Sequence, residues 1–363
     1  MRIGITVYDH LDVASGGYLY DRKLVKILRE RDHTVVELHQ RGGCYGDRLL
    51  QNMNNEYVDR VVEAKLDVLV QDELNHASLL RPNRRLRRIV RHPILGIVHH
   101  LMSVERRCPT LNRLIAGVEK AYLSTLDGYI CNSRTTHRTV ERLIGPNLPY
   151  VVAPPAADRV APSLSPDEVS DRVRRKRPLR LLFIGNLIER KGLDVLLKAL
   201  TRLFGEVPFH LDIVGGSEAD PTYAEAMEVL VDRLGLSGVV TFHGHTVGER
   251  LRELYRQADV LTVPSSYEGF GIVYLEGMAF GLPAIASLHG GAKEVVTHAE
   301  NGFLVPYGAS DRITGFLRTF AQRGELLERF SRAALRRYER HPAWSVTMAR
   351  AADFIERTAS VQV

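Results

Sequence analysis

The sequence predicts two α/β domains, each built on a doubly wound parallel sheet, with a cleft between them. Short runs of Val, Ile and Leu alternate with amphipathic helical stretches along the whole chain. Such runs are typical of strands buried on both faces of a parallel sheet. The alternation breaks once, at residues 153–178, and then starts again. The 363 residues are enough for two separate hydrophobic cores.

The first series of runs predicts the N-terminal domain. A strand-like run at 2–8 is followed by an amphipathic helical run near 18–31. In sheets of this kind, ligands bind outside the carboxyl ends of the strands, where loops lead into helix N-termini. The remaining strand-like runs of this half cover residues 33–38, 66–71, 94–100 and 127–132.

The second series predicts the C-terminal domain. The stretch before it, 153–178, has five prolines and many charged residues, as is typical of an interdomain linker. We therefore expect an N-terminal domain at residues 1–157 and a C-terminal domain at residues 158–344. The strand-like runs of the second half are 179–185, 209–215, 239–244, 258–264 and 283–287, with helical runs near 193–204 and 221–234.

The composition, 45% hydrophobic and 25% charged, is typical of a soluble globular protein. We find no apolar run of about 18 residues that would predict a membrane span, and the N-terminal residues lack the pattern of a signal peptide. The three cysteines, Cys44, Cys108 and Cys131, are odd in number and far apart, which predicts neither a disulfide framework nor a zinc site. These features favour a cytoplasmic protein.

The positive charge of the chain gathers in one segment, residues 81–93. Its sequence places Leu86, Ile89 and Val90 on one side of a short helix with basic residues around them. Such an element favours an anionic partner, either a membrane surface or an acidic acceptor, while a solvated, salt-bridged helix face fits equally well. Nucleic acid is disfavoured because no aromatic residues are interleaved. The arginines are Arg81, Arg84, Arg85, Arg87, Arg88 and Arg91.

Two glutamates near the end of a strand predict a ligand site. After the run 258–264, a loop carries Glu268 and Gly271, and a helix that ends at Gly281 carries Glu276 about two turns from its start. Glycines let backbone N–H groups approach a ligand, and a helix N-terminus favours an anion. A carboxylate, in contrast, accepts hydrogen bonds from sugar hydroxyls. The combination favours a nucleotide diphosphate sugar, although a solvated Glu268 and an exposed Glu276 remain the alternative.

Two further loops carry residues suited to ligand binding, one with two basic residues and one with two glycines. Arg190 and Lys191 follow the strand-like run 179–185 and precede a helix, so both can reach an anion such as a diphosphate; a solvated basic turn is the alternative. Gly16 and Gly17 open the first helix without the spacing of a dinucleotide-binding fingerprint, so they are weak evidence for a bound dinucleotide. Having no side chains, they do leave backbone that a ligand can approach.

Several motifs together resemble a known family. The stretches "EGFGIVYLEGMAFGLP", "GNLIERKG", "VTFHGH" and "SGGYLYDRKLVKILRERDHTVVEL" are similar to the retaining glycosyltransferases of family four in the GT-B class. The resemblance implies two facing Rossmann-like domains, with the nucleotide-sugar donor site in the second and the acceptor site mostly in the first. It also implies that a final helix, residues 345–363, packs back on the first domain.

The resemblance implies a role for each matching residue. Glu276 would hold the ribose hydroxyls, Glu268 the hydroxyls of the transferred sugar, and Lys191, with a neighbouring arginine, the diphosphate. His99 matches a histidine that the family places near the reacting sugar, and His100 is the alternative. Further donor contacts would come from the backbone of Phe270, Gly271 and Ile272, from Gly16 and Gly17 over the diphosphate, and from Gly244 and His245 beside the base.

One position departs from the family pattern. Asn186 stands where the family usually has arginine, so one charge that would stabilise the leaving group is missing. Losing one preorganised donor costs roughly 3–4 kcal/mol of transition-state stabilisation. We hypothesise that Arg190 compensates. The sequence has no D-x-D motif, which argues against a divalent metal or any other cofactor, with cations and the helix dipole in its place.

The function expected from the sequence is therefore a retaining, metal-independent glycosyltransferase. It would move a hexosyl group from a nucleotide diphosphate sugar to a lipid-linked, saccharide or small-molecule acceptor, with peripheral contact to the inner face of a membrane. Two alternatives remain, a non-catalytic binder of sugar nucleotides and a sugar-nucleotide epimerase of the same fold. UDP, GDP and ADP are all open as the nucleotide.

Overall fold

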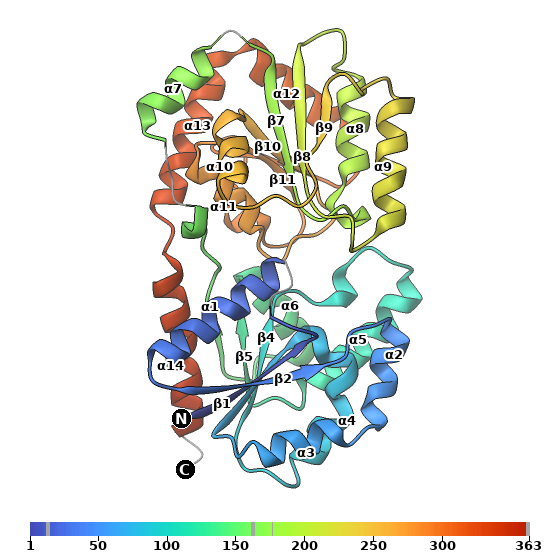
Figure 1. Cartoon of the computed structure of the whole chain (residues 1–363), viewed down its shortest axis with the longest axis vertical. Helices are drawn as coiled ribbons and strands as arrows, with labels where there is room; N and C mark the ends of the chain where they lie inside the picture. The colour runs from blue at the N-terminus through green and yellow to red at the C-terminus, as the bar shows by residue number, and fades with distance from the viewer. Residues whose placement is uncertain (12–14, 161–163, 176, 361–363) are drawn as a thin grey trace. The chain divides into compact units, whose positions relative to one another are not determined.

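The computed structural model describes residues 1–11, 15–160, 164–175 and 177–360 and divides the chain into two compact units (Figure 1). Unit 1 is Met1–Pro155 with Ala343–Val363, and unit 2 is Ala156–Pro342. Outside the described residues lie part of the first glycine loop (12–14), part of the predicted linker (161–163 and 176) and the last residues of the predicted final helix (361–363).

Unit 1 contains one parallel sheet in the order β2-β1-β3-β4-β5-β6. Every residue of β3 and β4 is buried, as expected for apolar strands covered on both faces. The first five strands coincide with the predicted runs, whereas β6, three partly exposed residues, was not predicted. The strands are β1 (Arg2–Tyr8), β2 (Thr34–Gln40), β3 (Val68–Asp72), β4 (Ile94–Val98), β5 (Gly128–Cys131) and β6 (Tyr150–Val152).

The last helix of the chain belongs to unit 1. Helix α14 (Trp344–Ser360) packs against α1 (Gly16–Glu30) (Figure 1). Arg31, directly after α1, pairs with Asp353 at 2.7 Å and with Glu356 at 3.0 Å. The other helices of the unit are α2 (Tyr45–Leu50), α3 (Glu56–Glu63), α4 (His76–Leu86), α5 (Pro109–Leu123) and α6 (Arg134–Ile144), with short 3-10 turns η1 (Gln51–Met53), η2 (Glu73–Asn75) and η3 (Met102–Val104).

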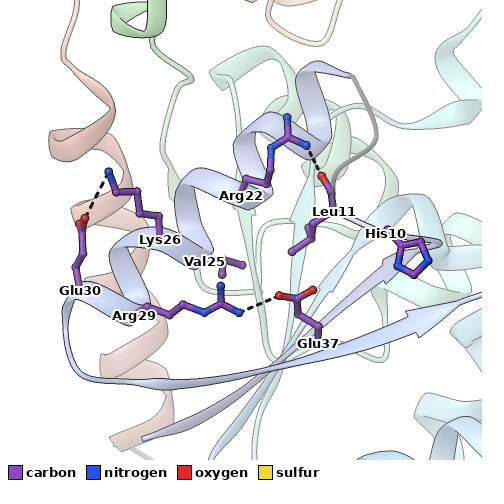
Figure 2. Close-up of a pocket in the computed structure, with 8 residues that line it drawn as sticks. All are labelled: His10, Leu11, Arg22, Val25, Lys26, Arg29, Glu30 and Glu37. Carbon is purple, nitrogen blue, oxygen red and sulfur yellow. Dashed lines mark hydrogen bonds and ion pairs between the residues drawn. The ribbon is translucent and has the colours of Figure 1, made fainter.

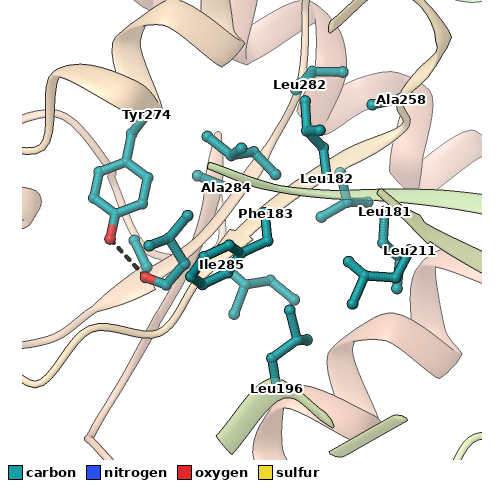
Figure 3. Packing of buried hydrophobic residues seen from close by; sticks show 14 of the residues in the cluster. Leu181, Leu182, Phe183, Leu196, Leu211, Ala258, Tyr274, Leu282, Ala284 and Ile285 are labelled. Atoms are coloured by element: carbon teal, nitrogen blue, oxygen red, sulfur yellow. Dashed lines mark hydrogen bonds between the residues drawn. The ribbon is translucent and has the colours of Figure 1, made fainter. Parts of the chain in front are cut away.

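Unit 2 contains a second parallel sheet, in the order β12-β11-β10-β7-β8-β9. Its core packs Phe183, Leu196 and Ile285 together, and the Tyr274 hydroxyl donates a hydrogen bond to the Val263 carbonyl at 2.7 Å (Figure 3). Only β12 was not predicted. The strands are β7 (Leu179–Ile184), β8 (Phe209–Val214), β9 (Val240–Phe242), β10 (Val260–Val263), β11 (Ala284–Ser287) and β12 (Gly302–Val305).

The C-terminal half of the predicted linker is a packed helix. Ser165 and Glu168 form a capping box that starts α7 (Pro166–Arg174), Val169 is fully buried, and the guanidinium of Arg172 donates to the Phe280 and Gly281 carbonyls. The linker prediction was therefore wrong for these residues. The other helices of unit 2 are α8 (Leu193–Thr201), α9 (Pro221–Arg233), α10 (Gly248–Gln257), α11 (Ile272–Ala279), α12 (Ser310–Gln322) and α13 (Gly324–Glu339), with 3-10 turns η4 (Asp158–Val160), η5 (Glu189–Lys191) and η6 (Gly291–Glu294).

The arginine segment does not form the predicted amphipathic helix. Helix α4 ends at Leu86, and residues 87–89 form a turn. Leu86 is buried in the core, whereas Ile89 is 58% exposed, so the two do not share one face. Arg87 explains the early end, because its guanidinium pairs with Asp127 at 2.8 Å and bonds the Thr125 carbonyl.

Among the described residues, none of the helices combines the length and the apolar character that crossing a membrane requires.

Candidate functional site

The sheet of unit 2 brings three predicted loops to one edge. Strands β10, β7, β8 and β9 are successive neighbours and all run parallel, so their carboxyl ends point the same way. The loop after β10 carries Glu268, the loop after β7 carries Asn186 and Lys191, and the loop after β9 carries Gly244. This edge is the candidate donor site.

Glu268 and Lys191 meet in an ion pair at this edge. The Lys191 ammonium lies 2.6 Å from Glu268 Oε1, and the side chains are only 15% and 7% exposed. The Ser265 hydroxyl donates to the same carboxylate oxygen at 2.6 Å. The alternatives of a solvated loop glutamate and a solvated basic turn are therefore wrong for these two residues, because both are buried and paired.

The pair is ionised despite its burial. Burial raises the pKa of Glu268, but the charges of Lys191 and Arg190 outweigh it, so the pKa is lowered overall. Burial lowers the pKa of Lys191, and the Glu268 carboxylate opposes that effect. At neutral pH the carboxylate is an acceptor only, while the ammonium offers further N–H groups to an anion.

A glycine pair after β11 supports the backbone of Glu268. Gly291 N donates to Glu268 O at 2.6 Å, and a Cβ atom built on Gly290 would lie only 2.0 Å from that oxygen. Gly290 also has a positive φ of 86°. Only glycine fits there. The sequence reasoning missed this pair, although its signal, two glycines directly after a predicted strand, resembles that of Gly16 and Gly17.

The N-terminus of α11 lies beside Glu268. Gly271, the residue before the helix, has a φ of 89°, and a Cβ atom there would lie 2.4 Å from the Tyr274 ring. Phe270 is buried at 3% exposure, and Ile272 starts the helix. The first turn of a helix leaves N–H groups without intrahelical partners, and its dipole favours an anion there.

Glu276 lies deeper than predicted. It is four residues after the start of α11, just over one helical turn rather than two, because the helix begins only at Ile272. Its side chain is 1% exposed, which excludes the exposed-helix alternative, and its Oε2 accepts a hydrogen bond from the Tyr255 hydroxyl at 2.9 Å. Tyr255, on α10, was missed by the sequence reasoning, since a tyrosine in an amphipathic helix gives no specific signal.

Arg190 and Asn186 lie in the same loop as Lys191, and Arg190 connects that loop to the loop of Glu268. The Arg190 guanidinium donates to the Tyr267 carbonyl at 3.0 Å, and Ser266 N donates to the Arg190 carbonyl at 2.8 Å, so Arg190 ties the β7 loop to the Glu268 loop. Asn186 is half-buried directly after Gly185. Gly244 and His245 are exposed after β9, and the Gly244 carbonyl accepts from Gly215 N at 3.0 Å.

Unit 1 brings the other predicted residues together. Gly16 and Gly17 open α1 behind the N-cap Ser15, and a Cβ atom built on Gly17 would lie 3.2 Å from Cδ2 of His99. His99 follows β4, the second neighbour of β1. A fourth residue, Asp21, was not predicted: it is fully buried on α1, and its Oδ1 lies 3.3 Å from His99 Nε2.

His100 points to other partners. Its Nε2 lies 2.6 Å from Glu105 Oε1, and Glu105 also pairs with Arg107. His99 and His100 therefore belong to two different polar groups, and Gly17 contacts His99.

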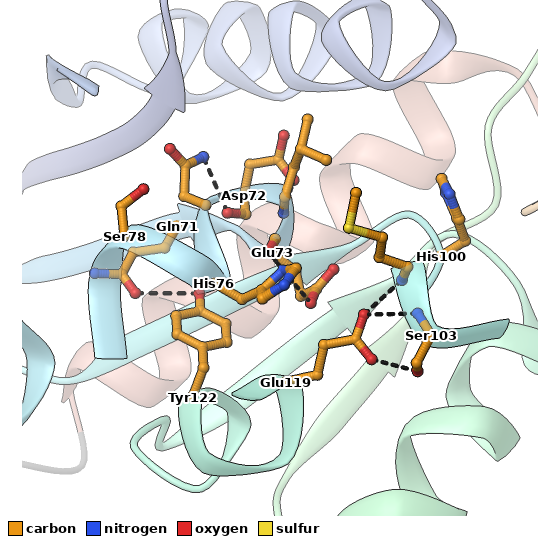
Figure 4. Close-up of polar contacts among 12 residues, drawn as sticks. Gln71, Asp72, Glu73, His76, Ser78, His100, Ser103, Glu119 and Tyr122 are labelled. Carbon is orange, nitrogen blue, oxygen red and sulfur yellow. Dashed lines mark hydrogen bonds and ion pairs between the residues drawn. The ribbon is translucent and has the colours of Figure 1, made fainter. Parts of the chain in front are cut away.

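A buried polar network contains Asp72, Glu73 and Glu119 (Figure 4). Asp72 has a carboxyl oxygen within 4.8 Å of a ring nitrogen of His99. Asp72 ends β3 at 3% exposure, and burial together with the charge of Asp21 raises its pKa to about 7. Burial raises the pKa of Glu73 well above its ordinary range. Glu119 accepts hydrogen bonds from Met102 N, Ser103 N and the Ser103 hydroxyl. Four carboxyl groups are thus buried together, so part of their charge must be compensated by protons or cations.

With this geometry in place, comparison with known proteins decides the family of unit 2. Residues 166–337 match the family model described as "Glycosyl transferases group 1". The match covers most of unit 2, so unit 2 carries a domain of this family.

Curated relatives are similar to this chain over part of their length. The D-inositol 3-phosphate glycosyltransferase of Xylanimonas cellulosilytica is 33% identical over 234 residues, which cover 61% of this chain and 55% of that protein. The enzyme of the same name from Acidothermus cellulolyticus is 31% identical over 261 residues, which cover 67% of this chain and 56% of that protein. The chain thus spans about half the length of the curated relatives it matches.

Solved structures show the fold of the chain. Sucrose-phosphate synthase from Thermosynechococcus elongatus is similar with a TM-score of 0.82 at 20% identity, over 99% of each chain. Anabaena Alr3699/HepE, solved in complex with UDP and glucose, is similar with a TM-score of 0.76 at 18% identity, over 98% of this chain and 99% of that one. The two parallel sheets are the Rossmann-like domains of the GT-B fold, as the sequence predicted.

In unit 1, two groups of side chains have ligand atoms within 4.8 Å of one another: Asp21 with Asp72 and His99, and Glu73 with His76 and Glu119. Internal contacts already occupy much of both groups. His76 contacts the Glu73 carbonyl and the Tyr45 hydroxyl, and both Glu119 oxygens accept hydrogen bonds. The contacts fit a proton-bearing cluster, and the expectation that transfer needs no metal stays a prediction. Cys44, Cys108 and Cys131 form no disulfide among the residues that the structure describes.

A separate hollow of about 600 Å³ lies on the outer face of α1 (Figure 2). Its charged lining is mostly paired internally, Arg29 with Glu37 at 2.9 Å and Lys26 with Glu30 at 3.6 Å. None of the predicted site residues lines it.

Proposed function

We propose that this protein is a retaining glycosyltransferase that moves a hexosyl group from a nucleotide diphosphate sugar to an acceptor hydroxyl. The observation that carries the proposal is the buried Lys191–Glu268 pair at the carboxyl ends of β7 and β10, beside the N-terminus of α11. A cation and a helix N-terminus suit the diphosphate, and a carboxylate suits sugar hydroxyls. No simpler ligand uses all three groups.

Each residue then has one task. Glu268 accepts hydrogen bonds from hydroxyls of the transferred sugar, while Lys191 and the N–H groups at Gly271 and Ile272 hold the diphosphate. Glu276, fixed by Tyr255, receives the ribose hydroxyls. The printed titles of the Anabaena HepE structures, in complex with UDP and with UDP-glucose, support a donor of this class, and UDP is the first nucleotide to test.

In the proposed reaction, the bond between the sugar C1 and the diphosphate oxygen breaks, and a bond from C1 to the acceptor oxygen forms on the same face. The acceptor hydroxyl gives its proton to the departing phosphate oxygen. Lys191 neutralises the charge that develops on the leaving group, and the charge of Arg190 adds to it in the absence of an arginine at position 186. We propose that these cations replace a divalent metal.

The first test is thermal stabilisation of the purified protein by UDP, GDP and ADP, each with and without EDTA. A ligand at 100 times its Kd stabilises by about 2.7 kcal/mol, which shifts melting by several degrees. Stabilisation by one nucleotide, unchanged by EDTA, is the expected result. Stabilisation that disappears with EDTA contradicts the metal-free donor site, and no stabilisation by any nucleotide contradicts the donor site itself.

The second test separates catalysis from binding. Glu268→Gln is expected to abolish transfer from the stabilising nucleotide's sugar conjugates while nucleotide stabilisation persists, because the ribose and phosphate contacts lie elsewhere. Glu300→Gln, at an exposed glutamate of the same unit, is the matched control and should keep full activity. A wild-type protein that binds nucleotide but transfers no sugar is a binder only, and one that releases nucleotide without any acceptor behaves as an epimerase.

We further propose that unit 1 makes peripheral contact with an anionic membrane that carries the acceptor. Arg81, Arg84, Arg88 and Arg91 are exposed around the exposed Ile89, and each basic residue near an anionic surface contributes about 1 kcal/mol. The protein should sediment with anionic vesicles and not with zwitterionic ones, and an R84E/R88E variant should lose that binding. Equal sedimentation of the variant and the wild type contradicts this role.

A further inference from the structure

Asp21 is a carboxylate with an unusual setting. It lies one helical turn after Gly17 on α1, is 0% exposed, and its Oδ1 is 3.3 Å from His99 Nε2. Its other oxygen, Oδ2, is buried and has no hydrogen-bond partner in the part of the chain that the structure describes. A buried carboxylate is costly unless it is paired, so His99 is the group that stabilises it.

The ring of His99 is held from several sides. Gly17 leaves room for it, since a Cβ atom there would approach Cδ2 to 3.2 Å. The ring of Tyr20 packs edge-on at 5.2 Å between centroids. The Thr136 hydroxyl donates to the His99 carbonyl at 3.3 Å. These contacts fix the ring plane, and Asp21 engages its Nε2 atom, so that Nδ1 is the nitrogen left for a substrate.

The titratable groups that face His99 are mainly carboxyl groups. Asp21 faces it from α1, and Asp72 and Glu73 face it from the end of β3, while Tyr20 adds a neutral ring. Burial lowers the pKa of His99, but the Asp21 carboxylate, its hydrogen bond and the charge of Asp72 outweigh burial and raise that pKa to about 9. The imidazole is therefore charged at neutral pH.

We propose that Asp21 is the positioning residue of His99: it fixes the ring through Nε2 and keeps it as an imidazolium, so that Nδ1 donates a charged hydrogen bond to the substrate. This inference rests on the proposed transferase function for its substrate. In that function His99 acts as a charged donor toward a sugar oxygen and not as a base, since its second nitrogen carries a proton and has no lone pair to accept another.

The test that needs no activity is an NMR titration of the histidine rings, with His99 assigned from the spectrum of His99→Gln. In the wild type, His99 is expected to titrate near pH 9. In Asp21→Asn its pKa should fall toward the ordinary value of about 6.5. Glu356→Gln, which removes the carboxylate 2.9 Å from His33, is the matched control and should leave His99 unchanged.

The outcome is decisive in either direction. A wild-type His99 that titrates near 6.5, or one that titrates alike in the wild type and Asp21→Asn, overturns the inference. The pKa of His99 in the wild type tests the inference even if Asp21→Asn does not fold. Because no sugar transfer is involved, this result is independent of whether the proposed function is correct.

The activity readout uses the pH profile. If the charged ring is required, Asp21→Asn should keep near-normal kcat at pH 6 and lose roughly thirtyfold at pH 8, since the charged fraction falls by that factor when the pKa drops from about 9 to about 6.5. KM should change less than kcat. A purely structural role for Asp21 would lower kcat equally at both pH values, and that result would overturn the inference.

Discussion

Lys191 and Glu268 are 77 residues apart in the sequence, and their charged groups lie 2.6 Å apart. The first follows β7 and the second follows β10, and these strands are neighbours in the sheet. The side chains are only 15% and 7% exposed, so each group keeps the other ionised and in place. A donor that binds at this edge meets charges that are already oriented, which reduces the reorganisation needed on binding.

Lys191→Met should destabilise the protein by about 3 kcal/mol at pH 7, because it leaves the buried Glu268 carboxylate without its partner. Lys198→Met is the matched control. It removes an exposed ion pair with Asp194 and should cost less than about 0.5 kcal/mol. Urea unfolding of both variants measures the difference. Equal losses would show that the Lys191–Glu268 pair adds nothing beyond a surface pair.

The same variant predicts a pH dependence. Lys191 helps to hold the pKa of Glu268 below its ordinary value of 4.5, so this contribution to stability is present above pH 4.5 and is lost as the pH falls through the lowered pKa. The difference in unfolding free energy between the wild type and Lys191→Met should therefore be larger at pH 7 than at pH 4. A difference that does not change with pH would falsify the ion pair as its origin.

Gly271→Ala should destabilise unit 2 by about 1–3 kcal/mol. The added Cβ atom would lie 2.4 Å from the Tyr274 ring, and the φ of 89° disfavours any side chain. It should also weaken nucleotide binding, because it displaces the first turn of α11. Gly315→Ala is the control: Gly315 is inside α12 with open space around it, so alanine should stabilise by up to about 1 kcal/mol. Thermal unfolding measures the expected loss of stability in Gly271→Ala and the expected gain in Gly315→Ala.

Tyr255→Phe should weaken nucleotide binding more than it weakens the fold. The ring stacks on Phe280 at 5.1 Å, and phenylalanine keeps that contact. The lost hydrogen bond leaves the Glu276 carboxyl oxygen without this donor in a buried site, which costs about 1–3 kcal/mol. Tyr223→Phe, which removes a longer bond of 3.3 Å to Asp194, is the comparison. Nucleotide affinity unchanged in Tyr255→Phe would argue against Glu276 as the ribose ligand.

His99 predicts a loss of stability at alkaline pH. Its pKa is raised from 6.5 to about 9 in the folded protein, so its contribution is complete below pH 6.5 and is lost as the pH rises through 9. The pKa of Asp72, raised to about 7, acts in the same direction over a lower range: burial of Asp72 costs more stability as the pH rises from 3.8 to 7. Above pH 7.5 the His99 effect should therefore dominate. Urea unfolding between pH 6 and 9.5 of the wild type and His99→Gln measures it.

The sequence alone was sufficient for the fold and for most of the residues of the candidate site. Apolar runs predicted ten of the twelve strands, because buried parallel strands must be apolar on both faces. The two missed strands, β6 and β12, are only three and four residues long. Glu268, Lys191 and Gly271 were found because a charge or a glycine at the end of an apolar strand has few structural reasons to be there.

Other features depend on contacts between distant parts of the chain. The predicted linker contains α7 because Arg172 bonds the carbonyls of Phe280 and Gly281, more than 100 residues away. Asp21 was missed because, in the sequence, it is one acidic residue in an amphipathic helix. Its burial and its contact with His99 arise only when α1 packs beside the end of β4.

Local sequence thus determined where strands end and which chemical groups stand at those ends, since the side-chain pattern and the glycine positions follow from backbone geometry. Tertiary structure decided which of these groups meet, how deeply they are buried and which of them are charged. Those properties depend on desolvation and on charges brought within a few ångströms, and strand order in the folded sheet is what brings them there.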